Sequence, residues 1–273
     1  MTTEQNSTQL GTYVKANGID IYYEESGSGY PLLLIHGGSV TCKMWQPYIG
    51  PLALHFRVIT PDSRGHGRTN NSANELSYRG MATDVAAFID ALGLSQPLVA
   101  GYSDGGQIAL ELGMRYPTLA RALVVGAAWY EFSDRYFTWL RKLGFEEPGA
   151  VNLEQTERAF PGLYKAWQSE HDPVYLPTML KQLSATFWTP LNYTDAEFGQ
   201  ISAPTLVVQG DRDEAIPIEQ AVAMYRWIPQ GELAIIANMS HGAALGSRST
   251  ALLSVMLDFL LRHSGDEARS AMA

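Results

Sequence analysis

The sequence has 273 residues, a length typical of one α/β enzyme that carries an insertion, and its 46% hydrophobic content argues against disorder. Its formal net charge of −9 and its pI near 5.1 disfavour nucleic acid and anionic membrane surfaces as partners. Cys42 is the one cysteine of the chain, so no intrachain disulfide can form, and we expect a cytoplasmic protein from a reducing compartment.

The first 130 residues predict a β-hairpin followed by alternating strands and helices. Residues 1–12 are polar and lack the apolar core of a secretory signal. After the Asn17-Gly18 turn, apolar and polar residues alternate, which indicates a hairpin over 13–25. Beyond the hairpin we expect strands at 31–35, 57–60, 97–102 and 122–127, and helices at 43–54, 76–92 and 107–115.

Residues 131–199 differ from the rest because no strands alternate with helices there, and five prolines divide the segment into short helical pieces. The alternation then returns, with strands expected at 204–209 and 233–237 and helices at 218–227 and 243–262. We therefore predict a core of residues 1–130 and 200–273 with a helical cap of residues 131–199. In an open, mostly parallel sheet such an insertion lies above the carboxyl ends of the strands, where these folds place their sites.

The stretch Gly101-Tyr102-Ser103-Asp104-Gly105 lies between an expected strand and an expected helix, and it matches the G-x-S-x-G pattern of a nucleophile elbow. So sharp a turn holds its serine in a strained backbone conformation with the hydroxyl exposed. Glycine is needed two residues before and after the serine because a Cβ there would clash. The helix that follows directs its free N–H groups toward an oxyanion. An ordinary glycine-rich turn with an incidental serine is the alternative.

Two later strand ends supply partners for this serine, because a serine hydroxyl needs a base and the base needs an orienting group. Asp213 follows the first of the two strands beyond the cap, and His241 follows the second. We therefore predict that Ser103, Asp213 and His241 form a catalytic triad. Their order along the chain differs from the orders found in the two common serine protease families.

Other acidic residues offer alternatives for the orienting group. Asp211 directly follows the glycine that ends a strand, where a turn-forming residue is expected, so Asp213 is preferred. Glu131 and Asp134, which follow the strand before the cap, are further alternatives. Asp213 lies far enough along its loop to reach back over the edge of the sheet.

Two backbone N–H groups are expected to form an oxyanion hole. One belongs to Asp104, directly after the serine, and the other to Gly38 in the loop after the strand at 31–35. That loop lacks the spacing of a phosphate loop, and an ordinary glycine-rich turn is its alternative interpretation. His36 and His66 are interpreted as structural. No group of His, Asp or Glu has metal-ligand spacing, so we predict neither a metal nor a cofactor.

Taken together, these segments resemble the α/β-hydrolase superfamily over nearly the full chain. The residues that carry the resemblance are His36-Gly37-Gly38, Asp62 to Gly67, Gly101 to Gly106, Gly210 to Asp213 with Pro217, and Ser240-His241-Gly242. The resemblance implies the α/β-hydrolase fold, a mostly parallel eight-stranded sheet with helices on both faces and a helical lid insertion. The chain order Ser, Asp, His is the order of that superfamily.

Within the superfamily the chain looks most like lidded carboxylic-ester hydrolases. Its Ser-Asp-Gly-Gly elbow is similar to that of the valacyclovir-hydrolase (biphenyl hydrolase-like) branch. For that branch the resemblance implies that the aspartate after the nucleophile can bind a substrate ammonium, whereas Asp104 could instead cap the elbow helix. A serine at position 103 differs from the aspartate nucleophile of haloalkane dehalogenases and epoxide hydrolases, and it implies an acyl-enzyme.

Residues 131–200 carry 13 of the chain's 29 aromatic residues, which indicates a packed element rather than a flexible loop. Some of them are expected to form the cap's own core and others to line an apolar pocket above Ser103. The candidates for substrate contact are Trp45, Trp129, Trp139, Trp167 and Trp188. Phe160, Tyr164 and Phe187 are further aromatic residues of the cap that could face the pocket.

These features predict a serine hydrolase that cleaves a carboxylic ester or lactone of a small, largely apolar or aromatic substrate through an acyl-enzyme. One alternative is a C–C bond hydrolase, enol-lactone hydrolase or perhydrolase that uses the same triad. Another, of a different class, is a non-catalytic ligand-binding receptor that keeps the fold and a vestigial triad. We expect a small-molecule substrate as partner, neither nucleic acid nor a membrane, and a monomer or homodimer.

Overall fold

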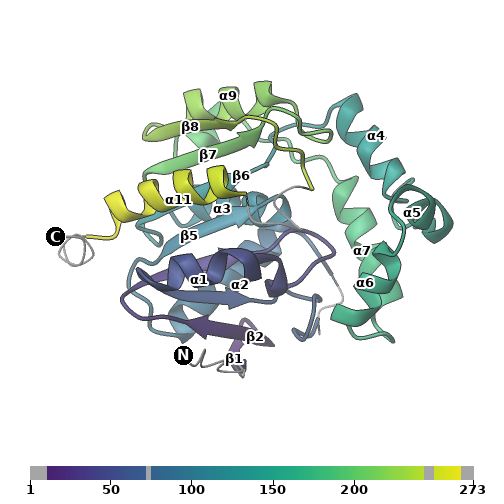
Figure 1. The fold of residues 1–273 in the computed structure, drawn as a ribbon, viewed down its shortest axis with the longest axis horizontal. Coiled ribbons are helices and arrows are strands. Elements are labelled where there is room, and N and C mark those ends of the chain that lie inside the picture. The colour runs from purple at the N-terminus through teal and green to yellow at the C-terminus, as the bar shows by residue number, and fades with distance from the viewer. Residues whose placement is uncertain (1–10, 72–74, 243–248, 266–273) are drawn as a thin grey trace, which may run out of the picture.

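A computed structural model describes residues 11–71, 75–242 and 249–265, which form a twisted sheet with helices on both faces (Figure 1). In spatial order its eight strands are β1 (Thr12–Ala16), β2 (Ile19–Ser26), β4 (Phe56–Pro61), β3 (Tyr30–Ile35), β5 (Leu98–Tyr102), β6 (Ala122–Gly126), β7 (Thr205–Gly210) and β8 (Gly231–Ile236). Strand β2 pairs antiparallel with both β1 and β4, and all other pairs are parallel. The predicted fold class is confirmed.

The hairpin of β1 and β2 follows from its two-residue turn. Asn17 and Gly18 both have positive φ, 45° and 76°, as a tight turn between right-twisted strands requires. The turn fixes the register in which Ala16 faces Ile19. In this register Ile19 and Ile21 are buried, because alternate residues of a strand point to the same face.

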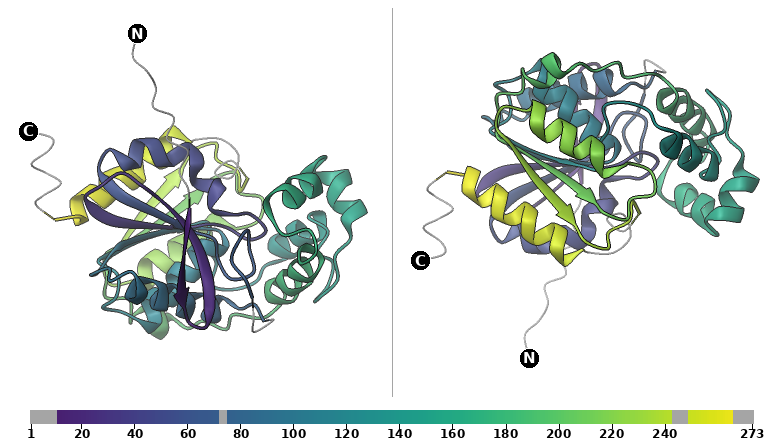
Figure 2. Two further views of the ribbon diagram at one scale, coloured as in Figure 1. Left: turned by 90° about the horizontal axis from the view of Figure 1, so that it is seen from below. Right: turned by 90° about the horizontal axis from the view of Figure 1, so that it is seen from above.

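Two layers of helices cover the sheet. The helices are η1 (Cys42–Trp45), α1 (Gln46–Ala53), α2 (Tyr78–Ala91), α3 (Asp104–Arg115), α4 (Asp134–Lys142), α5 (Leu153–Ala159), α6 (Leu163–Glu170), α7 (Leu176–Phe187), α8 (Asp195–Phe198), α9 (Ile218–Trp227) and α11 (Thr250–His263). Figure 2 shows α1 and α11 on one face of the sheet and α2, α3 and α9 on the other. None of the helices in the described ranges combines the length and apolar character needed to cross a membrane.

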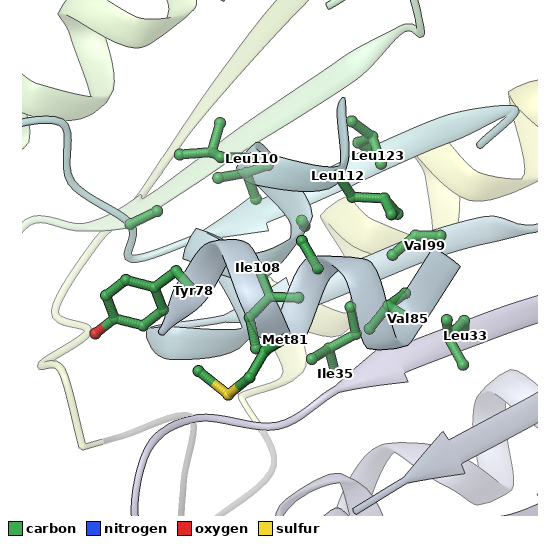
Figure 3. Close-up of a cluster of buried hydrophobic side chains, with 14 of the residues drawn as sticks. Leu33, Ile35, Tyr78, Met81, Val85, Val99, Ile108, Leu110, Leu112 and Leu123 are labelled. Carbon is green, nitrogen blue, oxygen red and sulfur yellow. The ribbon is translucent and has the colours of Figure 1, made fainter. Parts of the chain in front are cut away.

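Because the central strands are covered on both sides, successive residues enter different cores. In β3, Leu32 and Leu34 belong to the apolar cluster under α1 and α11, whereas Leu33 and Ile35 belong to the cluster under α2 and α3. Figure 3 shows part of the second cluster, in which side chains of α2 and α3 pack against those of β3, β5 and β6. The buried apolar side chains of α4, α6 and α7 belong to this same cluster.

Helices α4 to α8 occupy the segment between β6 and β7, where we predicted a helical cap. In Figures 1 and 2, α4 to α7 gather on one side of the molecule, beyond an end of the sheet. The division of the chain into core and cap domains stays a prediction. The terminal helix was expected from residue 243, but α11 begins at Thr250, and residues 243–248 lie outside the described ranges.

Candidate active site

The turn between β5 and α3 holds Ser103 in a strained conformation. Its φ of 57° and ψ of −120° fall in a region that side-chain-bearing residues rarely adopt. Helix α3 begins at Asp104 rather than near Gln107, where the pattern predicted it, so its first turn starts directly at the serine. A Cβ built on Gly105 would overlap the carbonyl oxygen of Ile35, which explains the glycine at this position.

The structure brings Ser103, His241 and Asp213 into one chain of hydrogen bonds. Ser103 Oγ lies 3.0 Å from His241 Nε2, and His241 Nδ1 lies 2.9 Å from Asp213 Oδ2. Asp213 stands in the loop after β7, and His241 stands in the loop after β8. The carboxyl ends of parallel strands lie at the same edge of a sheet. The three residues, far apart in the sequence, therefore meet beyond the carboxyl end of β5.

The carboxylate of Asp213 is fixed by four donors. Its Oδ1 accepts the N–H groups of Ala215 and Ile216 at 2.8 and 2.7 Å, and its Oδ2 accepts the Gln209 side chain at 2.8 Å besides His241. Burial alone would raise the pKa of this carboxyl, but His241 and the two backbone donors outweigh burial and lower it. Asp213 is therefore ionised at neutral pH and can orient the imidazole.

His241 responds to that carboxylate. Burial would lower the pKa of His241, but the charge of Asp213 and its hydrogen bond outweigh burial and raise the pKa above 6.5. Its backbone is held as well, because its N–H donates to Glu214 Oε2 at 3.0 Å and its carbonyl accepts the Tyr102 hydroxyl at 3.2 Å. The imidazole is thus a base with a fixed orientation and an increased affinity for a proton.

The two predicted oxyanion donors stand next to the serine. Gly38 and Asp104 both line the cavity that contains Ser103 and His241. Within the described part of the chain, no hydrogen bond to another residue engages the N–H of either one. Both groups are therefore free to donate to an oxygen bound beside Ser103.

The carboxylate of Asp104 does not cap helix α3. Ser103 is the N-cap, and no side-chain hydrogen bond satisfies the first turn of the helix. Asp104 Oδ1 instead accepts the Tyr78 hydroxyl at 3.1 Å, and Oδ2 has no hydrogen-bond partner among the described residues. Of the two roles considered for this side chain, capping is the one that the geometry contradicts.

A partly open, mostly apolar cavity of about 120 Å³ lies between the serine and the helices of the segment 131–199. Its walls come from the loop after β3, the elbow, the segment after β6, α4 and the residues that follow it, α6, α7 and the loops after β7 and β8. The lining residues are Gly38, Ser39, Val40, Ser103, Asp104, Trp129, Tyr136, Trp139, Leu140, Leu143, Phe145, Leu163, Trp167, Phe187, Ala215, Ile216 and His241. Trp129, Trp139, Trp167 and Phe187 lie where the sequence predicted, but Phe160 and Tyr164 do not belong to this lining.

Trp45 and Trp188 do not line this cavity, so their prediction as pocket residues was wrong. Trp45 belongs to the short helix η1 before α1. Its side chain is buried in the apolar cluster under α1 and α11. Trp188 follows α7, stacks on Phe137 with ring centroids 4.7 Å apart, and donates its N–H to the Phe145 carbonyl at 3.3 Å. Proximity to a strand end or to the cap in sequence did not determine which way either ring points.

Other features near the site are structural. His36 Nε2 accepts the N–H of Ser63 at 2.8 Å, and its Nδ1 lies 2.7 Å from the Gly37 carbonyl, so the ring ties two loops together. A larger polar cavity of about 650 Å³ lies between residues 65–71 and 169–175 and contains none of the three triad residues. Within the described ranges, no cluster of three or more His, Cys, Asp or Glu residues could hold a metal ion.

Several site residues escaped the sequence analysis. Gln209 and Glu214 support Asp213 and His241, but neither follows a motif that could have marked it. Tyr136 and Phe145 complete the apolar wall of the cavity. The high aromatic content of residues 131–200 was the one sequence signal that could have indicated them. Tyr78 contacts Asp104 from α2, a helix without any sequence link to the elbow.

Comparison with known proteins assigns the family. The chain belongs to the α/β hydrolase fold family, whose model matches residues 30–246. It is 28% identical to 2-hydroxymuconate semialdehyde hydrolase of Pseudomonas sp. (strain CF600) over 95% of this chain and 97% of that protein. It is 36% identical to a RutD protein of Azorhizobium caulinodans over 84% of this chain and 91% of that one. The chain is thus a hydrolase of this fold.

Solved structures agree on the fold. A thermophilic esterase from Thermogutta terrifontis superposes with a TM-score of 0.72 at 23% identity, over 94% of this chain and 100% of that one. E-2-(acetamidomethylene)succinate hydrolase gives a TM-score of 0.75 at 20% identity, over 92% and 99%. The similarity of the elbow to the valacyclovir-hydrolase branch stays a prediction.

Proposed function

We propose that this hydrolase cleaves carboxylic esters or lactones of small, largely apolar or aromatic acids through an acyl-enzyme. The observation that carries the proposal is the Ser103–His241–Asp213 hydrogen-bond chain at the base of an apolar cavity. A serine activated by a buried, oriented histidine is the arrangement that acyl transfer requires.

Acylation begins when Ser103 Oγ attacks the substrate carbonyl carbon and its proton passes to His241 Nε2, 3.0 Å away. The carbonyl oxygen becomes an oxyanion, which the N–H groups of Gly38 and Asp104 stabilise. The intermediate then collapses, the bond to the leaving oxygen breaks, and His241 returns its proton to that oxygen. The alcohol leaves, or in a lactone stays attached to the acyl group.

Deacylation repeats the same steps with water as the nucleophile. Neutral His241 removes a proton from water as the water attacks the ester of Ser103, and the same two N–H groups bind the second oxyanion. When this intermediate collapses, His241 protonates Ser103 Oγ and the carboxylic acid is released. Asp213 stays ionised throughout and stabilises the imidazolium formed in both halves of the reaction.

The cavity limits the acyl group. Its volume of about 120 Å³ is somewhat smaller than the roughly 150 Å³ apolar cavity known to hold benzene. Aromatic and aliphatic side chains form most of its lining, and among the described residues neither a lysine nor an arginine belongs to it. We therefore propose that short aliphatic or single-ring acyl groups fit best, and that longer chains require the wall to move.

The proposal is tested with p-nitrophenyl acetate and a fluorophosphonate probe on the full chain and on Ser103→Ala. We expect the unmodified chain to release p-nitrophenol over many turnovers and to lose this activity when the probe labels Ser103. Ser103→Ala should keep its circular dichroism spectrum and be inactive with both reagents. Equal hydrolysis by Ser103→Ala would overturn the proposal, and stoichiometric labelling without turnover would support the receptor alternative.

C–C bond hydrolysis is a second candidate, and one observation favours it. The relative at 28% identity over 95% of this chain is named for the hydrolysis of 2-hydroxymuconate semialdehyde, a C–C bond substrate class. The same serine, base and oxyanion donors would serve that chemistry. A panel of short esters, lactones and vinylogous diketones, compared by kcat/KM, distinguishes the two, because the preferred class should exceed the other by orders of magnitude.

A further inference from the structure

Asp104 carries a carboxyl group that the proposed mechanism does not use. Only the N–H of this residue takes part in the reaction, yet the side chain is 4% exposed and lines the reaction cavity. One of its oxygens, Oδ1, accepts the Tyr78 hydroxyl at 3.1 Å. The other, Oδ2, is buried and lacks a hydrogen-bond partner within the described ranges. A buried carboxyl group that has one oxygen without a hydrogen-bond partner is costly to ionise.

The unpartnered oxygen lies against the oxyanion hole. A Cβ built on Gly38 would overlap Asp104 Oδ2 and would lie 2.9 Å from Phe187 Cζ. Oδ2 thus lies beside the backbone of the glycine that supplies the second oxyanion donor, where the Phe187 ring also approaches. A negative charge at this point would face the negative charge that develops on the substrate oxygen.

Within the described part of the chain, the ionisable groups around Asp104 offer no stable counter-charge. Tyr78 from α2 and Tyr136 from α4 are buried, and burial raises the pKa of each well above 10, so both remain neutral. His241 faces the carboxyl from the loop after β8, and it must itself be neutral to accept the Ser103 proton. Phe187 from α7 and Gly38 from the loop after β3 are uncharged.

The protonation of Asp104 therefore changes near neutrality. Burial raises the pKa of its carboxyl to about 7, although the Tyr78 hydrogen bond and His241 act in the opposite direction. Below this pH the group is a neutral acid, a state that apolar sites impose on carboxyl groups in other enzymes. Above it the group is an anion beside the oxyanion hole.

We propose that the Asp104 carboxyl is an electrostatic gate on the oxyanion hole: its neutral form permits turnover, and its ionised form opposes the oxyanion and suppresses turnover. The gate rests on the proposed function, because it acts on the oxyanion of acyl transfer. It differs from binding a substrate ammonium through this carboxyl, which would require the ionised form for activity.

The first experiment measures kcat/KM for p-nitrophenyl acetate between about pH 5 and about pH 9, at the isosbestic wavelength of p-nitrophenol, in the unmodified chain and in Asp104→Asn. In the unmodified chain, activity should rise as His241 loses its proton and fall, about tenfold or more, as Asp104 ionises. Asp104→Asn keeps the backbone N–H but cannot ionise, so the decline on the alkaline side should disappear.

A second variant should shift the pKa of Asp104 without removing its carboxyl group. Tyr78→Phe deletes the hydrogen bond that stabilises the ionised carboxyl and so should raise the pKa of Asp104. The alkaline decline should then shift to higher pH. A residue with a purely structural role would change the amplitude of the profile but not the position of this limb.

A third measurement does not depend on turnover. The ¹³C resonance of the Asp104 carboxyl, identified by its absence from aspartate-labelled Asp104→Asn, should titrate near pH 7. A carboxyl that is ionised throughout the range contradicts the gate. So does an unchanged alkaline limb in Asp104→Asn while activity still depends on Ser103. If Ser103→Ala retains the full activity, the proposed function fails as well.

Discussion

Asp211 and Asp213 stand two residues apart in the loop after β7, yet their carboxylates have different partners. Asp213 is buried and its Oδ2 lies 2.9 Å from His241 Nδ1. Asp211 is exposed, and its Oδ1 accepts the N–H of Asn238 at 2.6 Å, which ties the loop to the segment after β8. One carboxylate orients the base, and the other closes a turn.

Asp213→Asn should lower kcat for p-nitrophenyl acetate by about 10⁴-fold, the loss known for the equivalent change in a serine protease. The amide oxygen can still accept the N–H groups of Ala215 and Ile216, so the loop should keep its conformation. The amide NH₂ group would face Nδ1 and favour the wrong imidazole tautomer. Steady-state kinetics and the rate of fluorophosphonate labelling measure the effect.

Asp211→Asn is the matched control. It makes the same chemical change two residues away, where no contact to His241 exists in the described structure, so kcat should fall by less than about threefold. A comparable loss in both variants would show that the loop as a whole, and not the Asp213 carboxylate, carries the effect.

Replacing a glycine of the elbow should destabilise the fold, because a Cβ there has no room. A Cβ built on Gly101 would overlap the Gly105 carbonyl and lie 2.8 Å from the Gly106 nitrogen, and backbone atoms cannot rotate away. Gly101→Ala should therefore lower the free energy of unfolding by roughly 2–4 kcal/mol. Urea unfolding followed by tryptophan fluorescence gives the value, with Ser103 reactivity as a second measure of elbow geometry.

Gly50→Ala serves as the comparison. Gly50 lies within α1, and apart from its chain neighbours and the backbone of α1 itself, nothing described in the structure comes within 4 Å of a Cβ placed there. Alanine favours helix more than glycine does, but Pro51 disfavours helical backbone in a preceding residue that carries a Cβ. Because these two effects oppose each other, the free energy of unfolding should change by less than about 1 kcal/mol. Destabilisation of similar size in both variants would contradict the steric account of the elbow.

The sequence sufficed for the fold class and for the placement of Ser103, Asp213 and His241, because these depend on order along the chain. Strand–helix alternation determines a parallel sheet, and parallel strands deliver their following loops to one edge. Asp213 and His241 each follow a strand, so the topology alone brings them near Ser103.

Side-chain direction could not be predicted in the same way. Trp45 and Trp129 both follow strands of the sheet, yet Trp45 packs under α1 and Trp129 faces the cavity. The direction of the Trp45 side chain is set by helix η1. This helix has four residues, too few for a hydrophobic period to be recognised in the sequence. The unpartnered oxygen of Asp104 likewise lies beside the backbone of Gly38, 66 positions away, and no spacing rule links the two.

The cavity wall predicts a change in acyl specificity. Trp167→Leu shortens a buried side chain that lines the cavity and should admit longer acyl groups. The ratio of kcat/KM for p-nitrophenyl hexanoate to that for the acetate should rise roughly tenfold. Trp188→Leu, outside the cavity lining, is the control and should leave this ratio unchanged. Equal ratios in both variants would exclude this wall as the limit on chain length.

The buried carboxyl of Asp104 also predicts how stability depends on pH. Its pKa is about 7 in the folded chain against an ordinary value of 3.8, so between these values the folded state holds a proton that the unfolded state has lost. Stability must then fall as pH rises through this window, by about 4 kcal/mol in all, and the full loss is present above pH 7.

The Asp104→Asn side chain cannot ionise, so this variant should not lose stability in the same way. The free energy of unfolding of the variant, relative to the unmodified chain, should therefore increase by several kcal/mol between about pH 4 and about pH 8 in urea titrations. A difference that stays constant with pH would mean that Asp104 ionises equally easily in the folded and unfolded states, and it would contradict the electrostatic gate as well.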